Sequence, residues 1–120
     1  MAYFFDSYAI IELLNNNENY AQVAHETIIT NALHLGEVHY YLLRSYGKET
    51  AESLLRKLKV QLLEITLQIA LEASLFRYEH KKLELSYADC IGYVTALRYS
   101  MKFLTGDKAF EKLRDVEFIR

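Results

Sequence analysis

The sequence predicts an α/β fold: a three-layer α/β/α sandwich with a mainly parallel central sheet of about five short strands. Short β-branched or aromatic runs alternate along the chain with longer segments whose apolar residues recur at helical spacing. Strands that alternate with helices, joined by right-handed crossovers, form a parallel sheet with helices on both faces. The length of 120 residues fits one domain, residues 1–120, because domains typically contain about 100 to 150 residues.

Five short apolar runs are the predicted strands. The first is a continuous aromatic run that ends at Asp6, which is the pattern of a strand buried on both faces. The second is marked by β-branched residues, and the last is expected at an edge of the sheet because it is short. The predicted strands cover residues 2–5, 26–30, 60–64, 102–105 and 116–119.

The segments between these strands are the predicted helices. The clearest is 31–46, where Leu35, Val38 and Leu42 have the spacing of a buried helix face and Gly47 stands at the expected C-terminal position. The predicted helices cover residues 7–14, 20–24, 31–46, 48–58, 66–82, 86–100 and 110–113. The helices and strands alternate to the end of the chain, as the predicted fold requires.

Such a sheet binds its ligands in the crevice at the carboxyl ends of the strands. Topology alone places two acidic residues at this crevice, and two more lie on segments from which they could reach it. Asp6 ends the first strand, and Asp107 follows the fourth across a Thr-Gly turn. Asp89 lies in the first turn of its helix, and Glu37 lies about two turns into the helix that follows the second strand. Carboxylates that share a partly desolvated pocket repel one another unless a cation neutralises them. Oxygen ligands favour hard cations, so the predicted ion is Mg²⁺ or Mn²⁺.

Each of these acids also has a purely structural interpretation. Asp6 suits an N-cap position, and Ser86 with Asp89 has the spacing of a capping box. Asp107 suits a turn, and Glu37 could be a solvated helix residue. Taken singly, the structural interpretation is the stronger one for each acid, and it is their joint arrangement that predicts a metal site.

Composition restricts the class of protein and the kinds of site that the chain can contain. The formal net charge of −2 and the sequence pI of about 6.1 exclude an overall positive field, so a polyanionic substrate has to be recruited locally. The single cysteine cannot form an internal disulfide, which favours a reducing cytosol and a cytoplasmic protein. No apolar stretch approaches the roughly 20 residues of a membrane span. A zinc cage is not expected, because no His/Cys ligand pattern is formed by Cys90 with His25, His34, His39 and His80.

Four segments, in this order, resemble the motifs of the PIN domain, especially those of the small single-domain VapC-type toxins of bacterial and archaeal toxin–antitoxin pairs. The resemblance spans nearly the whole chain. The segments are Tyr-Phe-Phe-Asp-Ser-Tyr-Ala-Ile at 3–10, Leu-Gly-Glu-Val-His-Tyr-Tyr-Leu at 35–42, Leu-Ser-Tyr-Ala-Asp-Cys-Ile at 85–91 and Leu-Thr-Gly-Asp-Lys-Ala-Phe at 104–110. One position departs from the family pattern: Tyr8 stands where a small polar residue is common, and we expect its ring to narrow the site.

The resemblance implies a PIN-like nuclease domain that hydrolyses RNA with Mg²⁺ or Mn²⁺. It implies that the catalytic and metal-binding acids are Asp6, Glu37, Asp89 and Asp107. Ser7 and Thr105 would position water or a phosphate, although ordinary turn and capping chemistry explains them equally well. The implied partners are an RNA substrate and a cognate antitoxin, and an apolar, tyrosine-rich helical surface suits a homodimer. Two alternatives stay open: a non-catalytic binding or scaffold module, and a metal-dependent phosphatase or DNA nuclease.

Overall fold

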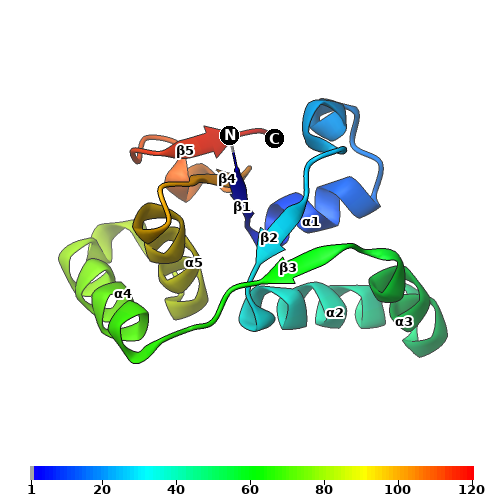
Figure 1. The fold of residues 1–120 in the computed structure, drawn as a ribbon, viewed down its shortest axis with the longest axis horizontal. Coiled ribbons are helices and arrows are strands. Elements are labelled where there is room, and N and C mark those ends of the chain that lie inside the picture. The colour runs from blue at the N-terminus through cyan, green and yellow to red at the C-terminus, as the bar shows by residue number, and fades with distance from the viewer. Residues whose placement is uncertain (1) are drawn as a thin grey trace.

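A computed structural model describes residues 2–120 and contains one five-stranded sheet in which every pair of neighbouring strands is parallel (Figure 1). The strand order is β3-β2-β1-β4-β5. The strands are β1 (Tyr3–Phe5), β2 (Ile28–Thr30), β3 (Val60–Leu62), β4 (Lys102–Thr105) and β5 (Val116–Phe118). The predicted α/β fold with about five short, mainly parallel strands is confirmed, and β5 lies at an edge as expected.

Helices cover both faces of this sheet. In Figure 1, α4 and α5 lie on the left of the strands, whereas α1, α2 and α3 lie on the right and below. The α-helices are α1 (Ser7–Leu14), α2 (Ala32–Tyr46), α3 (Lys48–Lys57), α4 (Leu67–Glu79) and α5 (Tyr87–Arg98). Three short 3₁₀ helices lie in the connections of the described chain: η1 (Glu18–Val23) between α1 and β2, η2 (Lys81–Leu83) between α4 and α5, and η3 (Lys108–Phe110) between β4 and β5. Among the residues described, no helix has the length and apolar character needed to cross a membrane.

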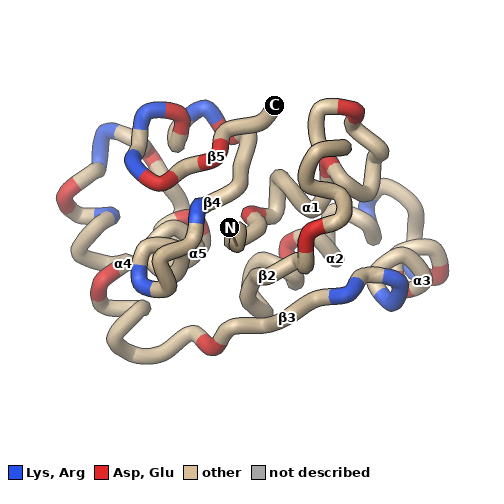
Figure 2. Tube along the Cα trace, turned by 45° about the horizontal axis from the view of Figure 1, so that its top comes forward, with Lys and Arg blue, Asp and Glu red and all other residues tan. Residues whose placement is uncertain are grey.

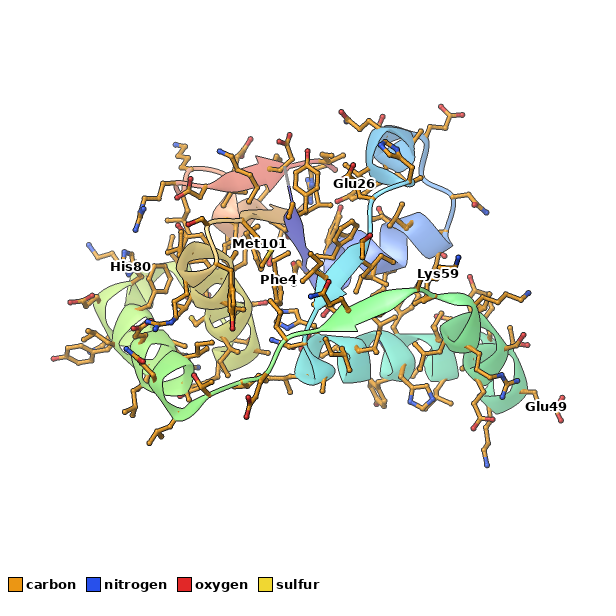
Figure 3. The ribbon with its side chains drawn as sticks, in the orientation of Figure 1. Phe4, Glu26, Glu49, Lys59, His80 and Met101 are labelled. Atoms are coloured by element: carbon orange, nitrogen blue, oxygen red, sulfur yellow. The ribbon has the colours of Figure 1, made fainter. Side chains whose placement is uncertain are left out.

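The buried apolar side chains form two cores, one on each face of the sheet. Successive side chains of a strand point in opposite directions, so one strand can contribute to both cores. Phe4 and Phe103 pack with α4 and α5, and their stacked rings have centroids 5.9 Å apart. Phe5 and Leu104 pack on the other face, with α1, α2 and α3. Figure 3 shows Phe4 in the middle of the molecule, between these helix layers. A continuous apolar run is therefore required in β1, which has no solvent-facing side.

One of the predicted helices is misplaced, and another is of a different kind. Instead of a helix at 110–113, the 3₁₀ helix η3 begins at Lys108, after the N-cap Asp107, and ends at the fully buried Phe110. The short helix predicted at 20–24 is present as the 3₁₀ helix η1, which begins at Glu18, after the N-cap Asn17, and ends at Val23. Both segments are too short for apolar periodicity to locate them, and a capping side chain and a buried ring decide where they lie.

Two further boundaries differ from prediction. The helix predicted at 66–82 ends at Glu79, where the backbone amide of His80 and its ring Nδ1 both approach the Phe76 carbonyl oxygen, Nδ1 at 2.9 Å. The second strand begins at Ile28 rather than at Glu26, because the Glu26 amide donates to the Val23 carbonyl oxygen in a turn. The remaining boundaries agree within one or two residues.

The strand order places the carboxyl ends of β1 and β4 side by side at the centre of the sheet. Phe5 pairs with Leu104, and the amide of the next residue, Asp6, donates to the Leu104 carbonyl oxygen at 3.0 Å. The chain leaves β1 toward β2 on one side and reaches β4 on the other, so the strand order reverses here. Ligands of open parallel sheets bind at such a point, which is where the predicted acids were expected.

Candidate functional site

Asp6 is the most deeply buried carboxylate of this region. It follows β1 directly, has extended backbone angles and caps α1. Its Oδ1 accepts a hydrogen bond from the Ser7 amide at 2.8 Å, and its Oδ2 accepts one from the Thr105 hydroxyl at 2.7 Å. The residue is only 4% exposed, and a buried carboxylate needs donors of this kind. The centre of the sheet therefore presents one rigidly oriented carboxylate.

Thr105 and Asp107 form a turn that supports Asp6. The fully buried Thr105 hydroxyl donates to Asp6 and accepts a hydrogen bond from the Asp107 amide at 3.1 Å. The Asp107 carboxylate in turn accepts from the Ala109 amide at 3.0 Å and so caps η3. Asp107 therefore lies in the predicted turn and, in addition, caps the 3₁₀ helix that follows. Thr105 contacts Asp6 directly, so it orients that carboxylate.

Glu37 is linked to the same place through Ser7. The Ser7 hydroxyl lies 2.6 Å from Glu37 Oε1 and 3.3 Å from the His34 carbonyl oxygen, and it can donate its one hydrogen to either. Glu37 is exposed on α2, but this contact turns its carboxylate toward the residue next to Asp6. Glu37 is therefore not simply a solvated helix residue.

Asp89 caps α5 and also lies near the charges of two other predicted acids. It completes a capping box with Ser86: its Oδ2 accepts from the Ser86 amide at 3.0 Å, and its own amide donates to the Ser86 hydroxyl at 3.1 Å. Burial raises the pKa of the Asp89 carboxyl above its usual value, and the charges of Asp6 and Asp107 raise this pKa further, against the two Ser86 hydrogen bonds. Three of the predicted acids thus lie within electrostatic reach of one another.

This raised pKa predicts a pH dependence of stability. Because the pKa of Asp89 in the folded protein lies above the ordinary 3.8, the folded protein binds this proton more tightly than the unfolded chain does. The free energy of unfolding should therefore fall as pH rises through the window between the two pKa values. Asp89→Asn should remove this decline while its amide oxygen still accepts from Ser86. Melting temperatures measured in EDTA from about pH 3 to about pH 7 check the prediction.

A decline in the variant as steep as in the wild type, or steeper, would contradict this assignment. Asp115→Asn is the matched control, because Asp115 is a surface residue beside Lys102 and Arg114. Its melting profile should keep the decline that Asp89 causes.

The acids suit a hard divalent cation, although each is turned toward a protein donor. Among residues 2–120, no group of three or more His, Cys, Asp and Glu side chains is gathered closely enough to form a ready set of metal ligands. Mg²⁺ needs only one or two protein carboxylates and keeps several waters, and Asp6 presents a carboxylate with the Thr105 hydroxyl beside it. The residues present therefore fit the ion. The four-acid metal site stays a prediction.

The thiol next to this site is inert. Cys90 is fully buried, and burial is the main cause that raises the pKa of its thiol to about 11. Since the thiolate is the form that binds metals and attacks electrophiles, Cys90 does neither near neutral pH. Its role is to pack α5 against the core that contains Phe4.

Comparison with protein families decides the classification of the chain. The family model for the PIN domain matches residues 3–116. This chain belongs to the PIN domain family. The matched span contains all of the predicted site acids, Asp6, Glu37, Asp89 and Asp107. No curated protein sequence matches the chain.

Solved structures share the PIN fold over the full length of the chain. A toxin–antitoxin complex from Klebsiella pneumoniae matches with a TM-score of 0.77 and 20% identity, covering 98% of this chain and 96% of that one. VapC20 of Mycobacterium tuberculosis, described as a toxin that cleaves the sarcin–ricin loop, matches with a TM-score of 0.81 and 18% identity, covering 99% and 100%. VapBC2 of Rickettsia felis, bound to a DNA fragment from its promoter, matches with a TM-score of 0.76 and 16% identity over all of both chains. At these identities the likeness is one of fold.

Tyr8 is the position where this PIN domain departs from the expected pattern. Its ring packs against Gly106: a Cβ atom on that glycine would overlap Tyr8 Cε1 and the Ile119 carbonyl oxygen. Tyr8 therefore lies against the turn that carries Thr105 and Asp107. A glycine in this turn makes room for the bulky ring, and an effect of Tyr8 on activity stays a prediction.

Three residues of this PIN domain site were missed from the sequence. His34 is 0% exposed and lies with its Nε2 atom 3.5 Å from Asp6 Oδ1. Its Nδ1 atom lies 2.9 Å from Oδ1 of Asn31, the N-cap of α2. Gly92 on α5 leaves the space that the His34 ring fills. The only sequence signal was that His34 stands three residues after an asparagine at a predicted helix start.

Proposed function

We propose that this PIN domain is a metal-dependent endoribonuclease that hydrolyses RNA phosphodiester bonds, and that it is the toxin of a type II toxin–antitoxin pair. One observation carries the proposal: the buried, oriented carboxylate of Asp6 lies at the reversal of strand order, with the charges of Asp89 and Asp107 acting on the same space. So much negative charge in a partly buried site suits a divalent cation. A phosphodiester could approach this site only together with that cation.

Each residue of the site has a proposed role in binding the ion or positioning the reactants. Asp6 holds the ion, and Thr105 keeps the Asp6 carboxylate in one orientation through its 2.7 Å hydrogen bond. Ser7 and Glu37, joined at 2.6 Å, lie beside it and position the attacking water or a phosphate oxygen. The bound ion, Mg²⁺ or Mn²⁺, supplies Lewis-acid activation of water and stabilises the charge that develops on the phosphate.

Asp89 and Asp107 are the two remaining acids of the proposed metal site. In the structure, each of the two carboxylates accepts a hydrogen bond from a nearby backbone amide, that of Ser86 or of Ala109. A carboxylate has two oxygens and several acceptor sites, so it can keep a capping bond and still bind a cation or a metal-held water. The capping interpretation and the metal interpretation are therefore compatible for both residues.

Local cations have to recruit the RNA. Figure 2 shows Lys and Arg interspersed with Asp and Glu around the outer helices and turns, in keeping with the net charge of −2. One cavity of about 580 Å³ lies between α4 and the start of α5 and is lined by Arg77, Lys81 and Tyr87, among others. Basic and aromatic side chains together suit phosphates and stacked bases. That VapC20 is described as cleaving an RNA loop supports RNA as the substrate class.

Partners are proposed on two observations. Two of the similar structures are described as toxin–antitoxin complexes, which supports a cognate antitoxin.

A stripe along α4, made of Leu67, Leu71, Leu75 and Tyr78, is exposed at helical spacing. Exposed apolar stripes of this kind mark protein interfaces, and we assign this one to a second copy of the chain. Light scattering checks the assignment, since a monomeric mass at micromolar concentration would contradict it.

The decisive experiment tests the reaction itself. Protein freed of metal with EDTA should leave structured RNA intact, and added Mg²⁺ or Mn²⁺ should restore cleavage. DNA and a phosphomonoester, tested under the same conditions, should stay intact, which separates a ribonuclease from a DNA nuclease or a phosphatase. If folded protein cleaves none of these substrates with either ion, it is the non-catalytic binding module. We place the protein in the cytoplasm, where RNA substrates are found.

A further inference from the structure

The imidazole of His34 is buried inside the acidic site without a role in the function proposed above. The side chain is 0% exposed and stands near the start of α2, with its ring edge-on to Phe4 at a centroid distance of 5.4 Å. Buried polar groups are almost always hydrogen-bonded. The Nε2 atom of His34 is nevertheless buried and has no hydrogen-bond partner among residues 2–120.

The neighbouring Asn31 determines which ring nitrogen carries hydrogen. Asn31 Oδ1 accepts a hydrogen bond from the His34 backbone amide at 2.8 Å. A backbone amide can only donate, so the Asn31 side chain must turn its oxygen this way. The same oxygen lies 2.9 Å from His34 Nδ1, and an oxygen of this kind can only accept. Nδ1 therefore carries hydrogen, and in the neutral ring Nε2 presents a lone pair.

That lone pair faces Asp6. Nε2 lies 3.5 Å from Asp6 Oδ1, at a place where the side chain of Asp6 is also buried. Two acceptor atoms that face each other away from water repel, and a cation between them removes the repulsion. An imidazole that binds a metal usually donates its other N–H to an oxygen acceptor, which sets the tautomer. Asn31 provides that acceptor.

The packing of α5 fixes the position of this edge of the ring. A Cβ atom on Gly92 would lie 2.6 Å from His34 Cε1 and 2.7 Å from Nε2, so only glycine leaves the ring enough space. Gly92 lies on α5, about one turn after Asp89. The edge of the ring that carries Nε2 therefore lies close both to Asp6 and to the helix that carries Asp89.

We propose that His34 Nε2 and Asp6 Oδ1 bind the divalent ion of this site together. The inference rests on the metal requirement of the proposed function and assigns a nitrogen ligand that an all-carboxylate site lacks. Imidazole nitrogen favours first-row transition ions, whereas Mg²⁺ prefers oxygen ligands. The site accordingly prefers ions such as Mn²⁺ to Mg²⁺.

Electron paramagnetic resonance of bound Mn²⁺ tests the ligand directly. In the unmutated protein, pulsed measurements should detect coupling of Mn²⁺ to an imidazole ¹⁴N nucleus, and Mg²⁺ should displace the Mn²⁺ only at large excess. His34→Gln should lose the coupling and weaken Mn²⁺ binding at least about tenfold, with a smaller change for Mg²⁺. His25→Gln is the matched control, because its side chain is 75% exposed in the segment before β2. It should match the wild type.

A second variant guards against misfolding of the first. Asn31→Ser keeps a good N-cap residue for α2 but is too short to hold Nδ1, so it should weaken Mn²⁺ binding without unfolding the protein. The inference is overturned if Mn²⁺ binds the unmutated protein without ¹⁴N coupling. It is also overturned if folded His34→Gln binds Mn²⁺ as tightly as the wild type or more tightly, since His34 is then a cation paired with Asp6. If the unmutated protein binds neither ion, the metal requirement of the proposed function fails as well.

Discussion

Replacing Asp6 with asparagine should reduce the rate of RNA cleavage by about a thousandfold, or about 4 kcal/mol of transition-state stabilisation. Asparagine still caps α1 well, so the fold should survive. The substitution removes the negative charge of the carboxylate. This carboxylate faces His34 Nε2 and accepts a hydrogen bond from the Thr105 hydroxyl. The measurement is the initial rate on a structured RNA at a saturating concentration of Mn²⁺.

The control for this prediction is Asp115→Asn, the same chemical change at the start of β5. Asp115 has a positive φ of 57°, which asparagine tolerates, and its carboxylate makes only surface ion pairs. This variant should cleave RNA at the wild-type rate. If both variants do so, Asp6 is a helix cap alone and the catalytic assignment is wrong.

Replacing Gly106 with alanine should lower the free energy of unfolding by about 2 to 3 kcal/mol, the upper part of the usual range for overpacking a filled site. The new methyl group would overlap the Tyr8 ring and the backbone carbonyl oxygen of Ile119. The Tyr8 ring could turn away. The Ile119 carbonyl oxygen has less freedom, because the amide of the same residue donates a hydrogen bond to the Thr105 carbonyl oxygen. Equilibrium unfolding in urea measures the loss.

Gly36→Ala is the matched control for this measurement. Gly36 lies exposed within α2, and a Cβ atom there would meet nothing within 4 Å. Alanine should stabilise this helix by about 0.5 to 1 kcal/mol, because glycine loses more conformational freedom on folding. Equal unfolding midpoints for Gly106→Ala and the wild type would show that the turn yields to accommodate the methyl group.

Secondary structure was predictable where a local pattern was long enough. The stripe of Leu35, Val38 and Leu42 located α2, and the aromatic run before Asp6 located β1, because periodicity and burial leave a mark within a few residues. The short helix η3 was misplaced because the capping side chain of Asp107 and the burial of Phe110 decide where it lies. A span of a few residues carries too little periodicity to show this.

The sequence by itself determined the parallel α/β fold and the placement of Asp6 and Asp107 after the first and fourth strands, since both follow from local patterns and from the rules that connect parallel strands. That these two strands are neighbours was decided by the tertiary structure. Only the tertiary structure decided what the acids contact. Thr105 binds Asp6 across 99 residues of chain, and Ser7 reaches Glu37 across 30. The burial of His34 between Asp6 and Gly92 depends on how β1, α2 and α5 pack. Such contacts depend on strand order and helix packing, which bring together residues whose spacing along the chain carries no signal.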